Sequence, residues 1–339
     1  MPAWPAGEWA LIEQLAQVFG PAPPEVVQGI GDDCAVLALT PEGYLLWTID
    51  SLVEGVHFDL SYTSLKQLGR KALAVNLSDI AAMGGEPQFA LLSLGWPPNR
   101  ELSGALEVAA GLQEIAHQYG VGIIGGDTVQ SPTALMLSLT VIGRVRPDEL
   151  LCRRGAQVGD VVYVTGPLGE AAAGLEVLRR GMELSAEPQA ALLRAFLDPQ
   201  PQLRAARCLA QHHLATALID LSDGVATDLF HICCQSRVGA RLPAGQIPIS
   251  AAVRQAAEIL HLDPLTLALQ GGEDYQLLFT APAGQESQLH RGFQAAALSP
   301  PRAIGRIIAG DRVYLETPQG LQDISGSGFN HFATLLPAK

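Results

Sequence analysis

The sequence predicts a mixed α/β (α+β) protein built from two domains. Its 339 residues exceed what a single hydrophobic core usually serves. Strand-like and helix-like segments alternate without a strict βαβ rhythm, which favours two separate α/β domains over one doubly wound sheet. A polar stretch also interrupts the apolar periodicity near the middle of the chain. With 48% hydrophobic residues, the composition is that of an ordered globular protein.

The elements expected of the first domain follow in chain order. Strands are expected where aliphatic and β-branched residues run together, and helices where apolar residues recur with helical spacing and a glycine follows. These patterns give strands over 44–50, 89–96, 121–126 and 134–145, and helices over 65–84 and 101–120. The second helix ends at Gly120, a typical helix terminator.

A domain boundary is expected in the segment "RVRPDELLCRRGAQVG" (144–159), which is polar and contains Pro147. The predicted domains are therefore residues 1–147 and 148–339. The second domain should open with a strand over 160–166 and continue with helices to about residue 213. The elements that follow are a strand over 217–222, a helix from about 224, and strands over 275–282, 303–310 and 312–317.

Charge and composition exclude several classes of partner. The net charge is −13 and no basic stripe appears, so neither nucleic acid nor an anionic membrane is expected. No apolar run approaches the roughly 18 residues of a membrane span. The first 20 residues carry Glu8 and no cationic segment ahead of their apolar residues, unlike a signal peptide. Five cysteines without a C-x-x-C spacing suit a reducing compartment, so we expect a cytoplasmic protein.

The aspartates of the first domain occupy unusual positions. Five of the six follow glycines, end apolar strands or lie on an apolar helix, and only Asp59 has ordinary polar neighbours; the five are Asp32, Asp33, Asp50, Asp79 and Asp127. Each alone can be explained as a helix cap or a turn residue. Together, and without a Lys or Arg close by along the chain, they favour one shared cause. Carboxylates gathered at strand ends suit a hard divalent cation such as Mg²⁺.

Acidic residues also mark strand ends in the second half. Asp220, Ser222 and Asp223 stand where an apolar strand meets a helix, in "ALIDLSDGVATDLFHIC". Helix capping would explain Ser222 or Asp223 but not Asp220. In "QGGEDYQLLF", Glu273 and Asp274 follow two glycines and precede another strand. We expect the acidic strand ends of both halves to face one cleft.

Magnesium clusters usually bind phosphates, yet the common phosphate-binding motifs are missing. The sequence has neither a G-x-x-x-x-G-K-[ST] loop nor a kinase-type glycine-rich loop followed by a strand lysine, and it contains only three lysines. Phosphate charge must then be neutralised by metal ions, by backbone N–H groups at glycines and by arginines. Arg153 and Arg154 are the best placed, with a solvated linker as the alternative explanation for both.

Seven motifs in order resemble the thiamine-monophosphate kinase family. They are "GIGDDCAVL", "TIDSLVEGVHF", "KALAVNLSDIAAMGG", "GGDT", "IDLSDG", "GGEDYQLLF" and "SGSGFNHF", and they span about residues 29 to 333. The resemblance implies ATP-dependent, Mg²⁺-dependent phosphorylation of thiamine monophosphate to thiamine diphosphate, the last step of thiamine diphosphate biosynthesis. Its superfamily includes aminoimidazole-ribonucleotide synthetase and selenophosphate synthetase. It implies a homodimer in which the N-terminal domain binds ATP and Mg²⁺ and forms a dimer-interface sheet, while the C-terminal domain completes the site.

The resemblance also implies roles for individual residues. The implied metal ligands are Asp33, Asp50, Asp79, Asp127, Asp220 and Asp223, with Asp32 beside them. ATP contacts are implied at Gly126, Asp127, Arg153 and Ser222, and acceptor contacts at His57, Glu273 and Phe329. One departure concerns Ile49, where relatives commonly carry a hydroxyl residue. A side-chain ligand is lost there, although the Ile49 carbonyl and Thr48 remain available to a metal ion.

The expected chemistry needs no general base, and no catalytic side chain is predicted. A phosphate monoester has a second pKa near 6, so the acceptor is already mostly a dianion at neutral pH. The obstacle is repulsion between this dianion and the ATP polyphosphate, which metal ions and positioning overcome. Direct in-line transfer is therefore expected.

Two other functions stay open at this point. The first is another ATP-dependent synthetase or ligase of the same superfamily, which would act through an acyl-phosphate-like intermediate. Within that class, the position of Cys34 after the Asp pair suggests selenophosphate synthesis. Residues 1–31 contain neither the reactive Cys nor the Lys expected for selenophosphate synthesis, and Cys34 is better interpreted as a packed thiol. The second is a nucleotide-binding regulator that binds ATP without turnover.

Overall fold

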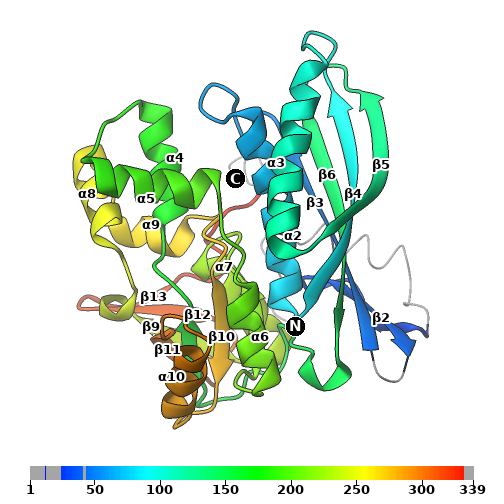
Figure 1. The fold of residues 1–339 in the computed structure, drawn as a ribbon. Coiled ribbons are helices and arrows are strands. Elements are labelled where there is room, and N and C mark those ends of the chain that lie inside the picture. Colours follow the sequence, from blue (N-terminus) through cyan, green and yellow to red (C-terminus); the bar gives the residue numbers. More distant parts are fainter. Residues whose placement is uncertain (1–11, 13–23, 41–42, 332–339) are drawn as a thin grey trace.

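The computed structural model describes residues 12, 24–40 and 43–331. Two β-sheets lie side by side, each with its own helices, and helix α2 runs between them (Figure 1). The expected mixed α/β fold with two domains is confirmed. The N-terminal segment that was compared with a signal peptide lies almost wholly outside the described residues, as does Phe332 of the last motif.

The first sheet has the strand order β1-β2-β3-β6-β4-β5. Its strands are β1 (Val26–Gln28), β2 (Ala35–Thr40), β3 (Gly43–Val53), β4 (Glu86–Trp96), β5 (Gly122–Gln130) and β6 (Met136–Val145). Neighbours pair antiparallel except β4 and β5, which are parallel. Side chains alternate along β3, so Leu46, Thr48 and Leu52 are buried on the inner face while Trp47 and Ile49 are exposed on the other.

Helices α2 (Leu65–Ala82) and α3 (Ser103–Tyr119) cover the inner face of this sheet. Helix α2 starts at a capping box formed by Ser64 and Gln67. The two helices approach so closely that a Cβ on Gly69 would lie 2.0 Å from a backbone oxygen of α3, and one on Gly111 would lie 1.9 Å from a backbone oxygen of α2. Only glycine fits at these two crossing points, which fixes how α2 lies on the sheet.

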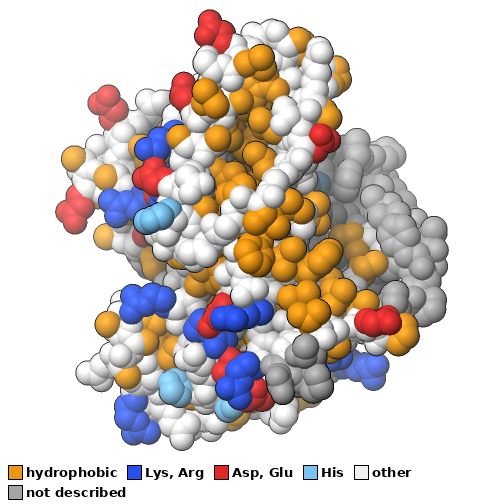
Figure 2. All heavy atoms as spheres, turned by 45° about the vertical axis from the view of Figure 1, so that its right-hand side comes forward, with side chains coloured by type: hydrophobic (Ala, Val, Ile, Leu, Met, Phe, Trp, Pro, Cys, Tyr) orange, Lys and Arg blue, Asp and Glu red, His pale blue; other side chains and the backbone are white. Residues whose placement is uncertain are grey.

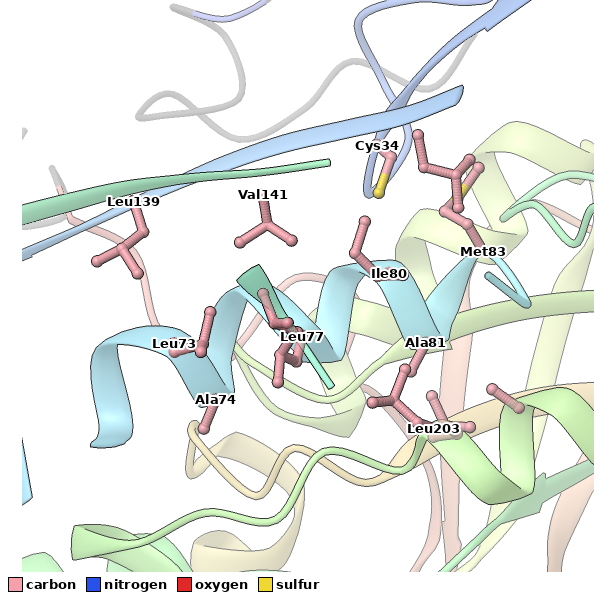
Figure 3. Close-up of a cluster of buried hydrophobic side chains, with 14 of the residues drawn as sticks. Cys34, Leu73, Ala74, Leu77, Ile80, Ala81, Met83, Leu139, Val141 and Leu203 are labelled. Carbon is pink, nitrogen blue, oxygen red and sulfur yellow. The ribbon is translucent and has the colours of Figure 1, made fainter. Parts of the chain in front are cut away.

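Helix α2 is buried from both sides (Figure 3). Its Leu73, Leu77 and Ile80 belong to one apolar core together with Leu139 of β6. On the other side of the helix lies Leu203, from the second domain. The core is therefore continuous across the domain junction, and it fixes the position of every polar side chain that α2 carries.

The second sheet has the strand order β13-β12-β9-β11-β7-β10-β8. Its strands are β7 (Val161–Val164), β8 (Ala217–Asp220), β9 (Gly239–Pro243), β10 (Leu277–Ala281), β11 (Arg302–Ile308), β12 (Val313–Thr317) and β13 (Gly320–Asp323). The helices of this half are α4 (Glu170–Arg180), α5 (Ala186–Leu197), α6 (Leu203–Gln211), α7 (Val225–Ser236), α8 (Ala251–Leu260), α9 (Pro264–Gln270) and α10 (Glu286–Ala295), with short 3₁₀ turns η1 (Pro147–Glu149) and η2 (Ala244–Gln246). Within the described residues, no helix combines the length and apolarity that a membrane span requires.

Each strand and helix predicted by range from the sequence is present, with ends that differ by a few residues. The structure adds elements that the sequence patterns did not reveal, namely β1, β2, β9, β13 and the helices α8, α9 and α10. Most of these strands are short, and β2 begins only two residues after the Asp32–Asp33 pair.

Candidate active site

A cleft of about 770 Å³ lies at the junction of the two domains. Its walls come from the 48–62 segment and α2 on one side and from α4, α7, α9 and the 271–275 loop on the other. Acidic side chains gather at one end, and aromatic side chains together with Glu273 line the rest. The expectation that the acidic strand ends of both halves share one cleft is met for most of these acids, although Asp127 and Asp274 do not line it.

The acidic end holds three carboxylates from three separate elements. Carboxylate oxygens of Asp33, Asp79 and Asp220 all lie within 4.8 Å of one another. Asp33 precedes β2, Asp79 is on α2, and Asp220 ends β8. Hydroxyl groups orient two of them: Thr48 Oγ1 donates to Asp79 at 2.5 Å and Ser78 Oγ donates to Asp220 at 2.6 Å. This is a rigid set of oxygen donors at the meeting point of both domains.

Burial and crowding raise the pKa values of Asp50, Asp79 and Asp220. Burial, followed by the charge of Asp33, raises the pKa of Asp50 to about 6 and that of Asp220 to about 8. The pKa of Asp79 is raised well above its usual value by burial and then by Asp50 and Asp220. Buried carboxylates that disfavour their own ionisation are expected where a cation belongs to the site. Their hard oxygen donors fit a divalent ion such as Mg²⁺.

Arg153 contacts Asp32 and Asp33, the first two acids of the cluster. Its guanidinium contacts Asp33 at 2.6 Å, and its backbone N–H donates to Asp32 at 3.3 Å. Burial and the charge of Asp33 raise the pKa of Asp32 to about 7. The sequence showed no cation near this pair because Arg153 lies 120 residues away along the chain. Its neighbour Arg154 is exposed, outside the cleft.

The side chains of consecutive residues in β3 point to opposite faces of the sheet. Thr48 and Asp50 are on the inner face, and the Asp50 N–H donates to Asn76 Oδ1 of α2 at 3.1 Å. Ile49 alternates with them, and its side chain is 65% exposed on the other face. A hydroxyl at position 49 would therefore point away from this acid cluster. Any contribution of Ile49 to the cluster comes from its backbone.

A second acidic group surrounds the start of α7. Ligand atoms of Asp223, Asp228 and His231 all lie within 4.8 Å of one another. Asp228 accepts hydrogen bonds from the backbone N–H groups of Asp223 and Gly224, at 3.2 and 3.0 Å, and so holds the turn that carries Ser222 and Asp223. Sequence reasoning missed Asp228; the available signal was an acid among the apolar residues of "GVATDLFHICC".

His57 and Phe329 line the cleft beside the acids. His57 Nδ1 accepts the backbone N–H of Val53 at 3.1 Å, which leaves the proton on Nε2, free to donate. Burial, then the charges of His331 and Lys71, lowers the pKa of His57 to about 4, so the ring is neutral. Phe329 is 47% exposed and contacts His331 edge to face at 4.8 Å, so it is not a core residue.

The loop that carries Glu273 is held in an unusual conformation. Glu273 and Tyr275 both have positive φ angles, 68° and 46°. Between them, the Asp274 carboxylate accepts the N–H groups of Gly169 and Ala171 at the start of α4, at 2.6 and 3.2 Å. Asp274 is therefore a helix cap, whereas the Glu273 side chain contacts Lys71 of α2 at 3.0 Å. Glu273, which the resemblance implies as an acceptor contact, is therefore also part of an ion pair within the chain.

Gly126 and Asp127 are the predicted site residues that the structure leaves outside this cleft. They lie on β5, three strands from Asp50, roughly 14 Å at the usual strand spacing. Asp127 pairs in register with Ser93, which puts its side chain on the face opposite the acid cluster, where it is exposed. Asp59, expected to be an ordinary surface acid, is exposed but lies at the rim of the cleft.

Two family models match this chain. The N-terminal domain of AIR synthase related protein matches residues 31–145, and the C-terminal domain of the same family matches residues 157–317. The solved structure of the hydrogenase maturation protein HypE in complex with ATP covers 89% of this chain and 90% of its own, with a TM-score of 0.68 and 22% identity. That likeness shows a shared fold.

Relatives with higher sequence identity define the family of this chain more closely. Thiamine-monophosphate kinase of Escherichia coli (strain K12) is 36% identical over 337 residues, covering 97% of this chain and 99% of the relative. That of Bacillus subtilis (strain 168) is 35% identical over 308 residues, covering 90% and 93%. The structure described as AaThiL complexed with AMPPCP and TMP has a TM-score of 0.81 at 31% identity and covers 94% of this chain and 96% of its own. This chain belongs to the thiamine-monophosphate kinase family.

Proposed function

We propose that this chain transfers the γ-phosphoryl group of ATP to thiamine monophosphate and so produces thiamine diphosphate. The observation that carries the proposal is the convergence of Asp33, Asp79 and Asp220 within 4.8 Å at one end of a cleft whose other lining includes His57, Glu273 and Phe329. One end suits metal-bound phosphates, and the other suits an aromatic, cationic group. The relatives' names and the AMPPCP and TMP of the AaThiL structure support the same pair of substrates.

Several Mg²⁺ ions are the proposed cofactor. Asp33, Asp50, Asp79 and Asp220 would hold them at the acid cluster, with Asp32 and the carbonyl of Ile49 close by, and Asp223 would hold one at the start of α7. Thr48 supports the set through its hydrogen bond to Asp79. When bound, these ions neutralise the charge that separates two phosphate groups.

Direct in-line transfer is the proposed mechanism, and the chain's own residues bind and orient. Arg153 and Ser222 are the proposed ATP contacts; both line the cleft, and Arg153 supplies a cation beside the acids. The neutral His57 donates from Nε2 to the acceptor phosphate. Because that phosphate is already ionised, no side chain needs to remove a proton. A radiolabelled phosphoryl group retained on the denatured protein after incubation with ATP alone would contradict direct transfer.

A homodimer formed through the first sheet is the proposed assembly. The face opposite α2 and α3, here called the outer face, exposes Trp47, Ile49, Phe89, Leu91, Val129 and Met136. Figure 2, which turns this side of the molecule forward, shows hydrophobic side chains gathered there. Exposed apolar patches on a protein surface often mark an interface. Gly126 and Asp127 lie on the strand that borders this face, so we propose that they serve the site of the partner subunit.

The proposed domains are residues 1–147, for ATP, Mg²⁺ and dimerisation, and 148–339, which completes the site. The proposed location is the cytoplasm, which the cysteine usage supports. Among the alternatives, a synthetase that uses Cys34 as its nucleophile is disfavoured because Cys34 is 2% exposed and burial raises its thiol pKa well above the usual value.

One assay tests the function. The purified chain is given Mg²⁺ and ATP, with and without thiamine monophosphate, and ADP and thiamine diphosphate are measured. We expect both products only when the acceptor is present. ATP consumption that does not depend on the acceptor, or ATP binding without turnover, would contradict the proposal.

A further inference from the structure

Lys71 is a buried cation for which neither the predicted site nor the proposed mechanism has a use. Its side chain is 1% exposed, and its ammonium lies 3.0 Å from Glu273 Oε2 and 3.9 Å from the centre of the Phe196 ring. A lysine is rarely buried unless it is paired, and these two contacts provide its partners. Glu273 and Phe196 both line the cleft, whereas Lys71 lies behind them.

Helix α2 connects Lys71 to the acid cluster. Residues 71, 75 and 79 recur every four positions and so share one face of the helix. Asp79 belongs to the acid cluster, and Val75 lines the cleft. Eight residues of helix separate Lys71 from Asp79 by roughly 12 Å along the axis. One rigid helix therefore presents an anion at the phosphate end of the cleft and a cation behind its other end.

Lys71 also joins the two domains where the acceptor is proposed to bind. Glu273 is 202 residues away and Phe196 is on α5, so both partners belong to the second domain. The backbone of Glu273 is already fixed, because its N–H donates to the Ser222 carbonyl at 2.8 Å and the next residue, Asp274, caps α4. With the Glu273 backbone fixed in this way, the ammonium of Lys71 contacts Oε2 of the carboxylate. Oε1 of Glu273 then remains available for another partner.

We propose that Lys71 is a positioning residue for the acceptor, holding the Glu273 carboxylate in one orientation and offsetting its charge. The oriented Glu273 carboxylate then recognises thiamine monophosphate by accepting hydrogen bonds from its N–H groups, and not as an isolated anion. This inference rests on the proposed function, because it assumes that the end of the cleft beside Glu273 receives thiamine monophosphate. The charge of Lys71 also helps to lower the pKa of the nearby His57, which keeps a second acceptor contact neutral.

The chain offers a matched control on the same helix. Lys66 also forms an ion pair, with Glu114 at 2.8 Å, but both side chains are about half exposed at the surface. The variants K66M and K71M therefore make the same substitution and remove one ion pair each. Surface pairs contribute little, so K66M should behave like the unmodified chain.

The experiment measures KM for thiamine monophosphate, KM for ATP, and the melting temperature. We expect K71M to raise KM for thiamine monophosphate about tenfold and to leave KM for ATP within about twofold, with K71R recovering most of the loss. A K71M variant with the constants of K66M would overturn the proposal. A parallel rise of both KM values that follows a fall in melting temperature would overturn it too, because it would assign Lys71 a structural role only.

A double-mutant cycle keeps the test decisive even if K71M folds poorly. If Lys71 acts through Glu273, then E273Q and K71M/E273Q should have the same KM for thiamine monophosphate. A further large rise in the double variant would show that Lys71 acts independently and would overturn the proposal. An activity assay of the unmodified chain distinguishes failure of the proposed function from failure of the proposed role of Lys71. Failure of that chain to phosphorylate thiamine monophosphate would overturn the proposed function itself, whereas normal turnover with an unaffected K71M would overturn only the role of Lys71.

Discussion

The guanidinium of Arg153 lies 2.6 Å from the carboxylate of Asp33, although 120 residues separate them in the sequence. Arg153 brings one positive charge to a region where Asp32, Asp33, Asp79 and Asp220 crowd together. One cation cannot balance four carboxylates. Without metal ions, the protein must therefore keep some of these acids protonated, and this requirement makes its stability depend on pH.

The chelator-treated protein should lose stability as the pH rises. The folded-state pKa values of Asp50, Asp32 and Asp220 are raised to about 6, 7 and 8. A raised carboxyl pKa gives stability that is complete at low pH and is lost as the pH rises through the folded-state value. We expect the melting temperature to fall by several degrees between about pH 5.5 and pH 8.5. Differential scanning calorimetry in EDTA measures it.

Added Mg²⁺ should reverse this dependence, because bound metal requires ionised carboxylates and its binding releases protons. The rise in melting temperature that Mg²⁺ causes should be larger near pH 8 than near pH 6. Equal rises at both pH values would show that the raised acids do not hold the metal.

Replacing Asp79 with Asn should abolish turnover and leave the fold intact. The side chain keeps its shape and can still accept the Thr48 hydrogen bond, but the cluster loses a charge that a cation needs. The melting temperature without Mg²⁺ should be unchanged or higher, since a crowded buried acid is removed. The control is Asp311→Asn, an exposed acid outside the cleft, which should keep full activity. Near-normal activity of Asp79→Asn at saturating Mg²⁺ would remove Asp79 from the site.

Replacing Phe329 with Ala should weaken binding of the acceptor alone. The exposed ring can stack on an aromatic or cationic group, a contact worth on the order of 1 kcal/mol. We expect KM for thiamine monophosphate to rise about five- to tenfold while KM for ATP stays nearly constant. Leu321→Ala, which removes an exposed apolar side chain from β13, is the control. Equal losses for both substrates, or a fall in melting temperature that matches the loss of activity, would contradict a binding role.

The outer face should hold the dimer together. Leu91→Glu puts a charge on the apolar outer face, so light scattering should report a dimer for the unmodified chain and a monomer for the variant. The same proposal predicts complementation between two inactive variants. In mixed dimers of Asp127→Asn and Asp79→Asn, one of the two sites has both carboxylates, so about a quarter of the full activity should return after random subunit exchange. No recovery would mean that Asp127 acts within its own subunit.

Local patterns of the sequence were enough to predict many of the helices and strands but not the contacts between distant ones. Helix α2 and strand β3 were evident because their apolar spacing extends over many residues. The ion pairs of Arg153 with Asp33 and of Lys71 with Glu273 join residues 120 and 202 positions apart, and no local pattern encodes them. The sequence did identify the acids of the cluster, because each is a carboxylate among apolar neighbours and can be recognised without knowing its distant contacts. These acids are Asp33, Asp50, Asp79 and Asp220.

Position within the sheet was the other feature that the sequence concealed. Asp127 looked equivalent to Asp50, since both follow apolar runs. The face of the sheet to which the Asp127 side chain points depends on the register of β5 against β4. That register is interrupted by an irregularity between Ala90 and Leu91. An irregularity of this kind changes the face to which later side chains point. A pattern of alternating residues cannot reveal it.

The alternation along β3 links two properties that would otherwise evolve separately. Thr48 and Asp50 face α2, while Trp47 and Ile49 face outward, and the ladder to β6 runs without interruption from Tyr44 to Val53. A slip of one residue in that ladder would bury Trp47 and Ile49 among the acids and leave Asp50 on the apolar face. Single insertions and deletions in β3 should therefore not be tolerated, because one misaligned residue would destroy the proposed metal site and the proposed subunit interface together.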